Sequence, residues 1–395
     1  MNKTLYVLAF LMISSMGHAQ DPDILLKSIE ANNPAIRASA KWLESEKYRS
    51  KTGIYPENPD ITFNYMRGNP DAIGNQQELE ITQKFSFPGY YFAISSMQKM
   101  EFSQSEVLAE KTINDILYKA HNEIITLIWL AKKELTLSKR LKESSDLLAL
   151  MQQGFERKEF SKPALDKVRI YHLNNQTEMA KLKSEIVIHN EILQQLNGGL
   201  TVNFTFSDYA PAESLPAFDS LQAKLMEFNP DIRIASLGME ISEQKVKVEN
   251  MNRLPKIEAG YKGETILNQK LQGIHTGISI PLWENKNKVK QARIEENWSL
   301  LNYDQVVSEI TSGLKAAYSN AQAVLQNYMN IKELASDSSL SESTFLLLKA
   351  GEISFPEYLS EVQLIFENQL NFLEVERDYF VLLNKINLLT GINVK

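Results

Sequence analysis

Hydrophobic and polar residues alternate along four short segments of the chain, which occur in two pairs. Residues 60–68 and 77–87 form the first pair, and residues 255–264 and 273–281 form the second. A period of two is typical of a β-strand with one apolar and one wet face. The apolar positions are Ile61, Phe63, Tyr65, Leu79, Ile81, Phe85 and Phe87 in the first pair, and Ile257, Ala259, Tyr261, Ile274, Ile278 and Ile280 in the second. The pattern predicts two β-hairpins.

Two much longer segments follow the strands and carry a helical pattern. Residues 90–153 contain neither Gly nor Pro, and residues 282–350 contain only Gly313. Apolar residues recur at spacings of seven, as at Leu117 and Ile124, which is typical of coiled-coil packing. At 1.5 Å per residue, each arm would reach about 100 Å. A turn region and a shorter return helix follow each arm, so the sequence predicts helical hairpins over 90–198 and 282–391. Shorter helices around 34–54 and 230–252 precede the strands.

These elements occur twice because the chain is internally duplicated. Asn33-Pro34 returns as Asn229-Pro230, and Pro59 as Pro255, at one constant offset. Pro88 and Pro281, and later Leu196-Asn197-Gly198 and Leu389-Thr390-Gly391, match at a second, slightly shorter offset. A change of loop length between two copies is what a surface turn tolerates. We therefore expect a first repeat over 20–198, a linker over 199–214 and a second repeat over 215–395.

The N-terminal residues 1–19 have the pattern of a secretory signal. Lys3 precedes an apolar run from Leu5 to Ile13, and small residues lead to Ala19. This run is shorter than the roughly 20 residues that a membrane-spanning helix needs. We expect an exported chain that begins at Gln20 after cleavage. No later apolar stretch is long and uncharged enough to span a bilayer as a helix, so any membrane insertion should use the strands.

Composition excludes several classes of function. The chain has no Cys, which rules out disulfides, thiolate metal sites and a lipid-modified cysteine. Its net charge of −7 argues against a nucleic-acid surface. Its five His residues have no partner at metal-ligand spacing, so we predict no bound metal and no cofactor. No phosphate loop, nucleophile elbow or acid–base pair indicates an enzyme.

The predicted strands suit a bilayer. Each has about the 9–11 residues that a tilted membrane strand needs, and aromatic residues such as Phe87, Tyr90 and Trp283 lie at the strand ends, where an interfacial girdle would form. Four strands cannot close a barrel, and open strand edges cannot lie in lipid, because their N–H and C=O groups would be unpaired. Several chains should therefore share one barrel. The alternative is that the two β-hairpins are soluble and pack on the helices, because such hairpins would show the same alternation of apolar and polar residues.

Taken together, these features resemble the TolC family of outer-membrane efflux ducts over essentially the whole mature chain. The resemblance rests on the Asn-Pro-x-Ile-Arg helix starts, on the strand-to-helix junctions at 85–89 and 278–283, on the segment from Lys349 to Ser354, and on the closing Leu-Asn-Gly and Leu-Thr-Gly. It implies a homotrimer with a 12-stranded barrel in the outer membrane and a 12-helix tunnel in the periplasm. It also implies a passive conduit that works with a periplasmic adaptor, or membrane fusion protein, and an inner-membrane pump.

The resemblance also assigns roles to the hairpin ends. The adaptor would contact two tips, formed by Gly154, Lys158, Ser161 and Pro163 in the first repeat and by Gly351, Ser354 and Pro356 in the second. Lys158 stands where the second repeat has Gly351, so we expect the two tips to contact the adaptor unequally. Acidic side chains past the second tip would narrow the periplasmic entrance. Glu357 matches the first such acid, while Ser360 replaces the second and has Glu361 beside it.

The sequence carries one short indication of the exported substrate. Residues 56–60, Pro-Glu-Asn-Pro-Asp, resemble a segment of the CzcC-type heavy-metal branch, which favours metal cations and a pump of the resistance-nodulation-division class. Drug export is the alternative within this family. A soluble periplasmic coiled-coil scaffold or adaptor is the alternative from another class, and dependence on detergent distinguishes it.

Overall fold

The computed structural model describes residues 22–70, 73–202, 208–209, 215–335 and 339–391. The predicted signal segment lies outside these residues, as does most of the predicted linker. The elements of the first repeat are α1 (Pro22–Asn32), α2 (Pro34–Arg49), β1 (Asp60–Met66), β2 (Gln76–Phe85), α3 (Pro88–Glu156) and α4 (Lys162–Leu196). Those of the second are α5 (Phe218–Phe228), α6 (Pro230–Met251), β3 (Lys256–Ile266), β4 (Gln269–Ser279), α7 (Lys288–Ala335), α8 (Ser339–Ala350) and α9 (Phe355–Thr390).

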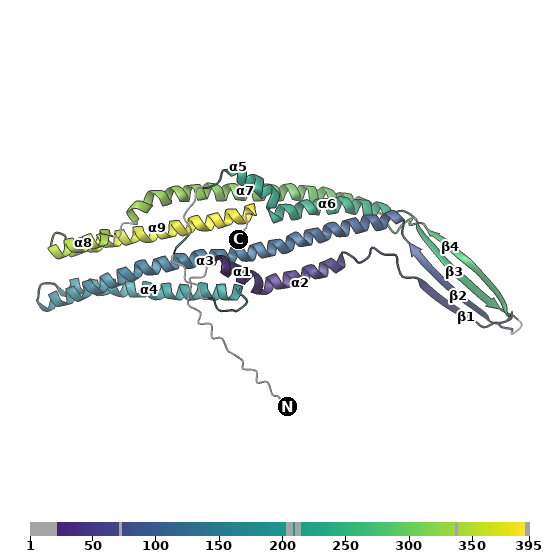
Figure 1. Ribbon diagram of the computed structural model, residues 1–395, viewed down its shortest axis with the longest axis horizontal. Helices are drawn as coiled ribbons and strands as arrows, with labels where there is room; N and C mark the ends of the chain where they lie inside the picture. The colour runs from purple at the N-terminus through teal and green to yellow at the C-terminus, as the bar shows by residue number, and fades with distance from the viewer. Residues whose placement is uncertain (1–21, 71–72, 203–207, 210–214, 336–338, 392–395) are drawn as a thin grey trace, which may run out of the picture.

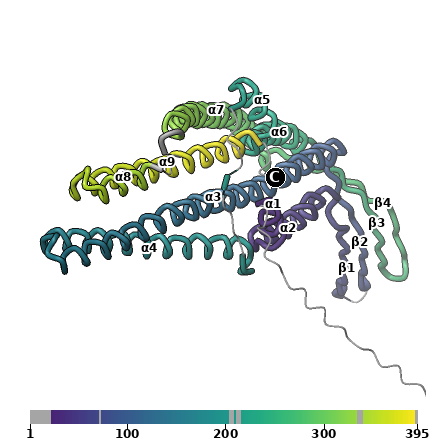
Figure 2. The backbone as a smooth tube through the Cα atoms, turned by 60° about the vertical axis from the view of Figure 1, so that its left-hand side comes forward, coloured from purple at the N-terminus to yellow at the C-terminus, as the bar shows by residue number. Residues whose placement is uncertain are grey.

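The molecule is an elongated helical body with a β-sheet at one end (Figures 1 and 2). The longest helix, α3, has 69 residues and so spans about 100 Å. From its far end α4 runs back along it, and α1 and α2 continue along α3 toward the sheet (Figure 1). In the second repeat, α9 and α6 line α7 in the same order. Both helical hairpins therefore turn at the end of the molecule opposite the sheet.

The two β-hairpins join into one antiparallel sheet of order β1-β2-β3-β4. The inner strands β2 and β3 pair along the whole of β2, from Gln76 opposite Ile266 to Phe85 opposite Ile257, with Ile81 opposite Tyr261. Each repeat thus contributes half of the sheet, and β1 and β4 form its two edges. Among the described residues, no helix is both long and apolar enough to cross a membrane.

A buried asparagine holds each repeat together at mid-length. Asn33 accepts the backbone N–H groups of Ala35 and Ile36 at the start of α2, while its Nδ2 donates to the carbonyl of Leu196 at the end of α4, 2.8 Å away. Asn229 caps α6 in the same way, and its Nδ2 donates to the carbonyl of Leu389 in the last turn of α9, again 2.8 Å away. The last carbonyls of a helix have no partner within it. Each asparagine therefore satisfies two helix ends at once.

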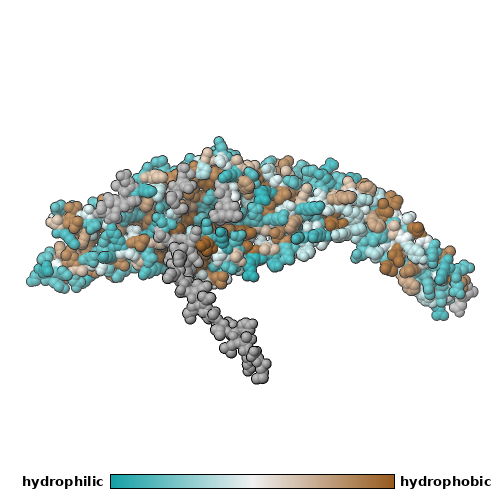
Figure 3. Space-filling model, viewed as in Figure 1, coloured by the Kyte–Doolittle hydropathy of each residue, from teal (hydrophilic) through white to brown (hydrophobic). Residues whose placement is uncertain are grey.

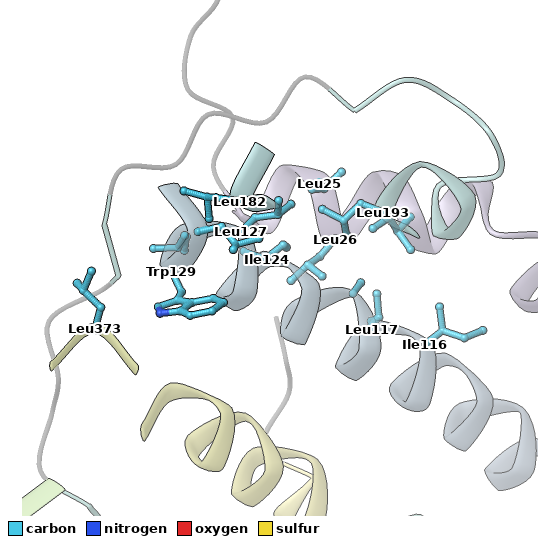
Figure 4. Close-up of a cluster of buried hydrophobic side chains, with 14 of the residues drawn as sticks. Leu25, Leu26, Ile116, Leu117, Ile124, Leu127, Trp129, Leu182, Leu193 and Leu373 are labelled. Carbon is cyan, nitrogen blue, oxygen red and sulfur yellow. The ribbon is translucent and has the colours of Figure 1, made fainter. Parts of the chain in front are cut away.

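In the part of the chain that the structure describes, buried side chains form three groups. One joins α1, α3 and α4 near mid-length, where Leu26, Ile124 and Leu193 meet (Figure 4). A second lies between α5, α6, α7 and α9 in the other repeat. The third joins the two hairpins beneath their turns and includes Met151 of α3 and Phe366 of α9. The packed core thus runs along the helices and does not include the sheet.

Some element limits differ from those predicted. The helix expected over 34–54 ends at Arg49, and Gly53 then takes a positive φ of 72° ahead of Pro56. A separate helix precedes it, because Pro34 starts a new helix and leaves α1 to end at Asn32. The second long arm begins at Lys288 instead of residue 282, since the intervening residues form turns and Asn287 has a φ of 68°.

Candidate functional site

The sheet turns its apolar side chains outward. Ile61, Ile81, Tyr261 and Ile274 lie opposite one another in a row across the four strands. All four are exposed, and Ile274 is 88% exposed. By contrast Thr82, on the other face of β2, is buried. The apolar face of a sheet in a water-soluble protein packs onto the core, so this sheet has the reverse arrangement.

The opposite face of the sheet is polar and charged. On this face, each strand is linked to its neighbour by one contact between an acidic and a basic side chain. The contact between β3 and β4 is an ion pair only when its histidine is protonated. The pairs are Asp60–Lys84, Glu78–Lys262 and Glu258–His275, at 3.6, 2.7 and 3.6 Å. This face suits contact with water and excludes contact with hydrocarbon.

Aromatic side chains lie where the strands meet the helices. Phe85 and Phe87 are exposed at the start of α3, and Trp283, between β4 and α7, is 79% exposed. The hydroxyl of Tyr91 accepts the backbone N–H of Ser86 at 2.9 Å, which fixes the first turn of α3 against the strand end. Figure 3 shows hydrophobic residues gathered around this junction on the visible face. Amphipathic rings at the end of an apolar strand are typical of a membrane interface.

The two helical turns at the far end share one backbone geometry. In the first, the N–H of Glu159 donates to the carbonyl of Gly154, and Lys158 has a φ of 61°. In the second, the N–H of Glu352 donates to the carbonyl of Leu347, and Gly351 has a φ of 74°. Both turns are Schellman motifs, which require a left-handed residue that is usually glycine. The lysine therefore changes the side chain at the first tip without changing its turn.

The return helices begin with the same cap in both repeats. Ser161 and Ser354 each accept the backbone N–H of the third following residue at 3.4 Å, and a proline follows two residues after each serine. Of the seven predicted tip residues, six are exposed: Lys158, Ser161, Pro163, Gly351, Ser354 and Pro356. Gly154 is buried, because the ring of Phe160 lies where a Cβ would project. Gly154 therefore shapes the turn and presents no side chain.

The predicted entrance acids, Glu357 and Glu361, lie one helical turn apart on the exposed face of α9. Tyr358 and Val362 face the opposite way, into the core between the hairpins. The carboxylate of Glu357 accepts the backbone N–H of Ser354 at 2.8 Å, completing a capping box. That bond and the Ser354 side chain hold the pKa of Glu357 below its ordinary value. Glu357 thus has a structural role at the helix start that its sequence position alone did not reveal.

Glu143, a partly buried carboxylate of α3 between the two hairpins, has the ammonium of Lys139 4.0 Å away. Glu143 of α3 accepts the hydroxyl of Ser341 of α8 at 3.3 Å, while its second oxygen is buried without a hydrogen-bond partner among the described residues. Burial raises the pKa of Glu143 above its ordinary value. This contact joins the two hairpins close to their turns. In the described part of the chain, no group of three or more His, Asp or Glu side chains is placed to hold a metal ion.

The chain is similar in sequence or in fold to several outer-membrane proteins. No family model matches the chain. The probable outer membrane lipoprotein SilC of Salmonella typhimurium is 21% identical over 409 residues, which cover 94% of this chain and 86% of that protein. The solved structure of CusC, described as forming a transmembrane channel, gives a TM-score of 0.79 at 16% identity and covers 94% of this chain and 92% of that one. The CmeC outer membrane channel of Campylobacter jejuni gives a TM-score of 0.78 at 13% identity, with coverages of 99% and 93%.

The chain has the fold of the outer-membrane channels. The resemblance to the TolC family that the sequence suggested is thereby confirmed, with a mostly helical body and a small antiparallel sheet as its architecture. The likeness extends over the helices and the sheet together, because more than nine-tenths of the chain is covered in each comparison.

Within this outer-membrane channel fold, a hollow that the sequence did not predict lies at the strand–helix junction. It has a volume of about 520 Å³ and lies between the end of α6 and the start of α7. Four basic residues line it: Arg253, Lys286, Lys290 and Arg293. No motif marks these residues. A comparison of the two repeats could have revealed them, because the matching positions in the first repeat are not basic.

Proposed function

We propose that this chain is the outer-membrane exit duct of a tripartite efflux system. The observation that carries the proposal is the exposed apolar face of the sheet, placed at one end of a helical body about 100 Å long. In this arrangement the sheet lies in the outer membrane and the helices extend through the periplasm. Substrate passes along the polar face without any chemical step.

The two strands of the second hairpin are long enough for a bilayer, whereas β1 has only 7 residues. The strands β3 and β4 each have 11 residues, which span about 37 Å along the strand and about 26 Å across a membrane at a tilt of about 45°. Each Ile or Phe moved from water into lipid contributes about 1.5–3 kcal/mol. The outward row is therefore strongly stabilised by hydrocarbon and is a liability in water.

The two edges of the sheet require partner strands. The outer edges of β1 and β4 would leave backbone groups unpaired in lipid, at several kcal/mol each. A closed barrel shared by several copies removes both edges. The trimer, with twelve strands and twelve helical segments, follows from the resemblance to the TolC family and is part of this proposal.

The tips provide the contact with the rest of the system. We place a periplasmic adaptor on the exposed tip residues Lys158, Ser161, Pro163, Gly351, Ser354 and Pro356, with Gly154 supporting the first turn. An inner-membrane pump of the resistance-nodulation-division type would supply the free energy. The cargo proposed from residues 56–60 is heavy-metal cations, with drugs as the alternative.

At the tunnel entrance, Glu357 and Glu361 would form rings of carboxylates by symmetry and favour cations. The change Glu357→Gln removes this charge, yet Gln at the same position preserves the capping box. We expect cation selectivity in planar bilayers to fall in Glu357→Gln and to stay unchanged in the control Glu191→Gln, an exposed acid on α4. Equal selectivity in both variants would remove Glu357 from the entrance.

The experiment that tests the duct is the mass of the detergent-solubilised protein, measured together with conductance in a planar bilayer. A stable trimer that conducts is the expected result. A monomer that stays in solution without detergent would refute membrane insertion and would support the periplasmic scaffold.

A further inference from the structure

The hollow between α6 and α7 gathers four basic side chains. No acidic residue lines it, and none of Arg253, Lys286, Lys290 and Arg293 forms an ion pair with any other residue that the structure describes. Two acids that lie close in sequence to these residues are engaged elsewhere. Glu284 pairs with Lys256 at 3.7 Å and Glu295 with Lys245 at 2.5 Å. Four cations around one hollow repel one another unless an anion joins them.

The duplication shows that the fold does not require this charge. At the repeat offsets, Arg253 matches Glu57, Lys286 matches Ala93, Lys290 matches Met97 and Arg293 matches Met100. In the first repeat, α3 begins directly at Pro88 and has no comparable turn. The basic cluster is thus a property of the second repeat alone.

A specific local structure creates the hollow. Residues 281–287 form bends and turns before α7 begins. Asn285, which is buried, donates from Nδ2 to the carbonyl of Asn252 and ties this segment to α6. Val289 and Lys290, in the first turn of α7, also line the hollow. A helix N-terminus adds partial positive charge to the lysine and arginine side chains around it.

The surroundings of the hollow are apolar on the side of the sheet. Leu282 lines the hollow and is exposed, and its neighbour Trp283 is more exposed still. On the preceding strand end, Ile278 and Ile280 are also exposed. A free inorganic anion would gain nothing from these side chains. A phosphate that carries acyl chains would bind the cations with its headgroup and cover the apolar residues with its chains.

We propose that this hollow binds the phosphate headgroup of an anionic phospholipid. The site rests on the proposed function, because it requires the sheet to lie in the membrane with the hollow at the level of the periplasmic leaflet. Arg253 and Arg293 are suited to bidentate contact with phosphate oxygens, and Lys286 and Lys290 supply further charge. Bound lipid would hold the turn at 281–287 at the membrane boundary.

The test uses the full mature protein in neutral detergent and native mass spectrometry to count bound lipids. Dioleoyl phosphatidylglycerol is compared with dioleoyl phosphatidylcholine, and inorganic phosphate is added as a competitor. The variant is Lys290→Gln with Arg293→Gln. The matched control is Lys224→Gln with Lys315→Gln, which removes the same charge from exposed positions on α5 and α7.

We expect retention of phosphatidylglycerol over phosphatidylcholine, and a loss of about 30-fold in phosphatidylglycerol affinity in the variant, since each basic residue near a lipid surface contributes about 1 kcal/mol. The control should bind like the unmodified protein. Unchanged binding in the variant would overturn the proposal. So would displacement of the lipid by millimolar phosphate, which would indicate a site for a free anion.

The oligomeric state separates this proposal from the duct itself. If a protein partner fills the hollow in the assembly, the variant will lose oligomer in lipid-free detergent while its lipid binding stays unchanged, and the lipid site will be refuted. If the protein is a soluble monomer, the proposed function as a membrane duct is refuted, whatever number of lipids is counted. An intact oligomer with reduced phosphatidylglycerol binding supports the site.

Discussion

Replacing Asn229 by alanine should destabilise the protein strongly, although the residue is far from both the sheet and the tips. The side chain is 2% exposed. Its Oδ1 accepts the N–H groups of Asp231 at 3.0 Å and Ile232 at 3.2 Å, and its Nδ2 donates to the carbonyl of Leu389 at 2.8 Å. Alanine keeps the backbone of this position but makes none of these bonds.

The size of the effect follows from two separate losses. Removing a helix N-cap costs about 1 kcal/mol. The carbonyl of Leu389 lies in the last turn of α9 and would remain buried without a donor, which costs about 1–3 kcal/mol. We therefore expect Asn229→Ala to lower the free energy of unfolding by about 2–4 kcal/mol.

The internal duplication supplies a matched comparison. Asn33 is 5% exposed and makes the equivalent bonds to Ala35, Ile36 and Leu196, so Asn33→Ala should lose the same amount. Asn174, exposed in the middle of α4, serves as the control, because Asn174→Ala should change stability by less than about 0.5 kcal/mol.

The assay is unfolding by denaturant, followed by far-ultraviolet circular dichroism in detergent at one fixed protein concentration, because dissociation of an oligomer would couple to unfolding. If Asn33→Ala and Asn229→Ala both behave like Asn174→Ala, the bridging role assigned to these asparagines is wrong. If only one of them destabilises, the two repeats are not equivalent at mid-length.

Three further predictions concern the hairpin ends. Lys158→Gly should raise the free energy of unfolding by about 1 kcal/mol, because glycine adopts the positive φ of 61° without a Cβ clash, and Gly351→Lys should lower it by a similar amount in the same denaturation assay. Glu143→Gln should stabilise by about 1 kcal/mol at pH 7, because burial of this charge outweighs its attraction to Lys139, and its second oxygen has no hydrogen-bond partner among the described residues. Burial raises the pKa of Glu143 in the folded state, so the unmodified protein loses stability as pH rises from the ordinary carboxyl pKa through that raised value. The stability advantage of Glu143→Gln should therefore disappear in acid. A constant advantage from about pH 4 to 8 would contradict this explanation. Glu357→Ala should increase the rate of proteolysis at the second tip relative to Glu357→Gln, because only alanine opens the capping box; equal rates would show that the box contributes nothing.

The period of the hydrophobic pattern was enough to find most elements. Alternation at Ile61, Phe63 and Tyr65 reflects the two faces of a strand, and the absence of Gly and Pro over residues 90–153 leaves nothing to interrupt a helix. The repeated Asn-Pro pairs located two helix starts, since proline fits the first turn and asparagine caps it. These signals are local, which is why one sequence carries them.

The backbone conformation at Lys158 and the surroundings of Glu143 could not be predicted from local sequence. The left-handed backbone at Lys158 is imposed by the hydrogen bonds that end α3, and the side chain only tolerates it. Nothing in the sequence near Glu143 reveals its partial burial, because its partner Ser341 lies in the other repeat.

The sequence by itself determined the duplication, the strands and the long helices of this protein, because each depends on neighbours within a few turns of the chain. Only the tertiary structure decided that the two hairpins form one sheet through β2 and β3, that the apolar row at Ile81 and Tyr261 faces outward, and that Arg253 meets Lys290 and Arg293 around one hollow. Those outcomes depend on which surfaces pack together across nearly two hundred residues. Residue periodicity specifies that a face is apolar, but the packing of the whole chain determines what that face contacts.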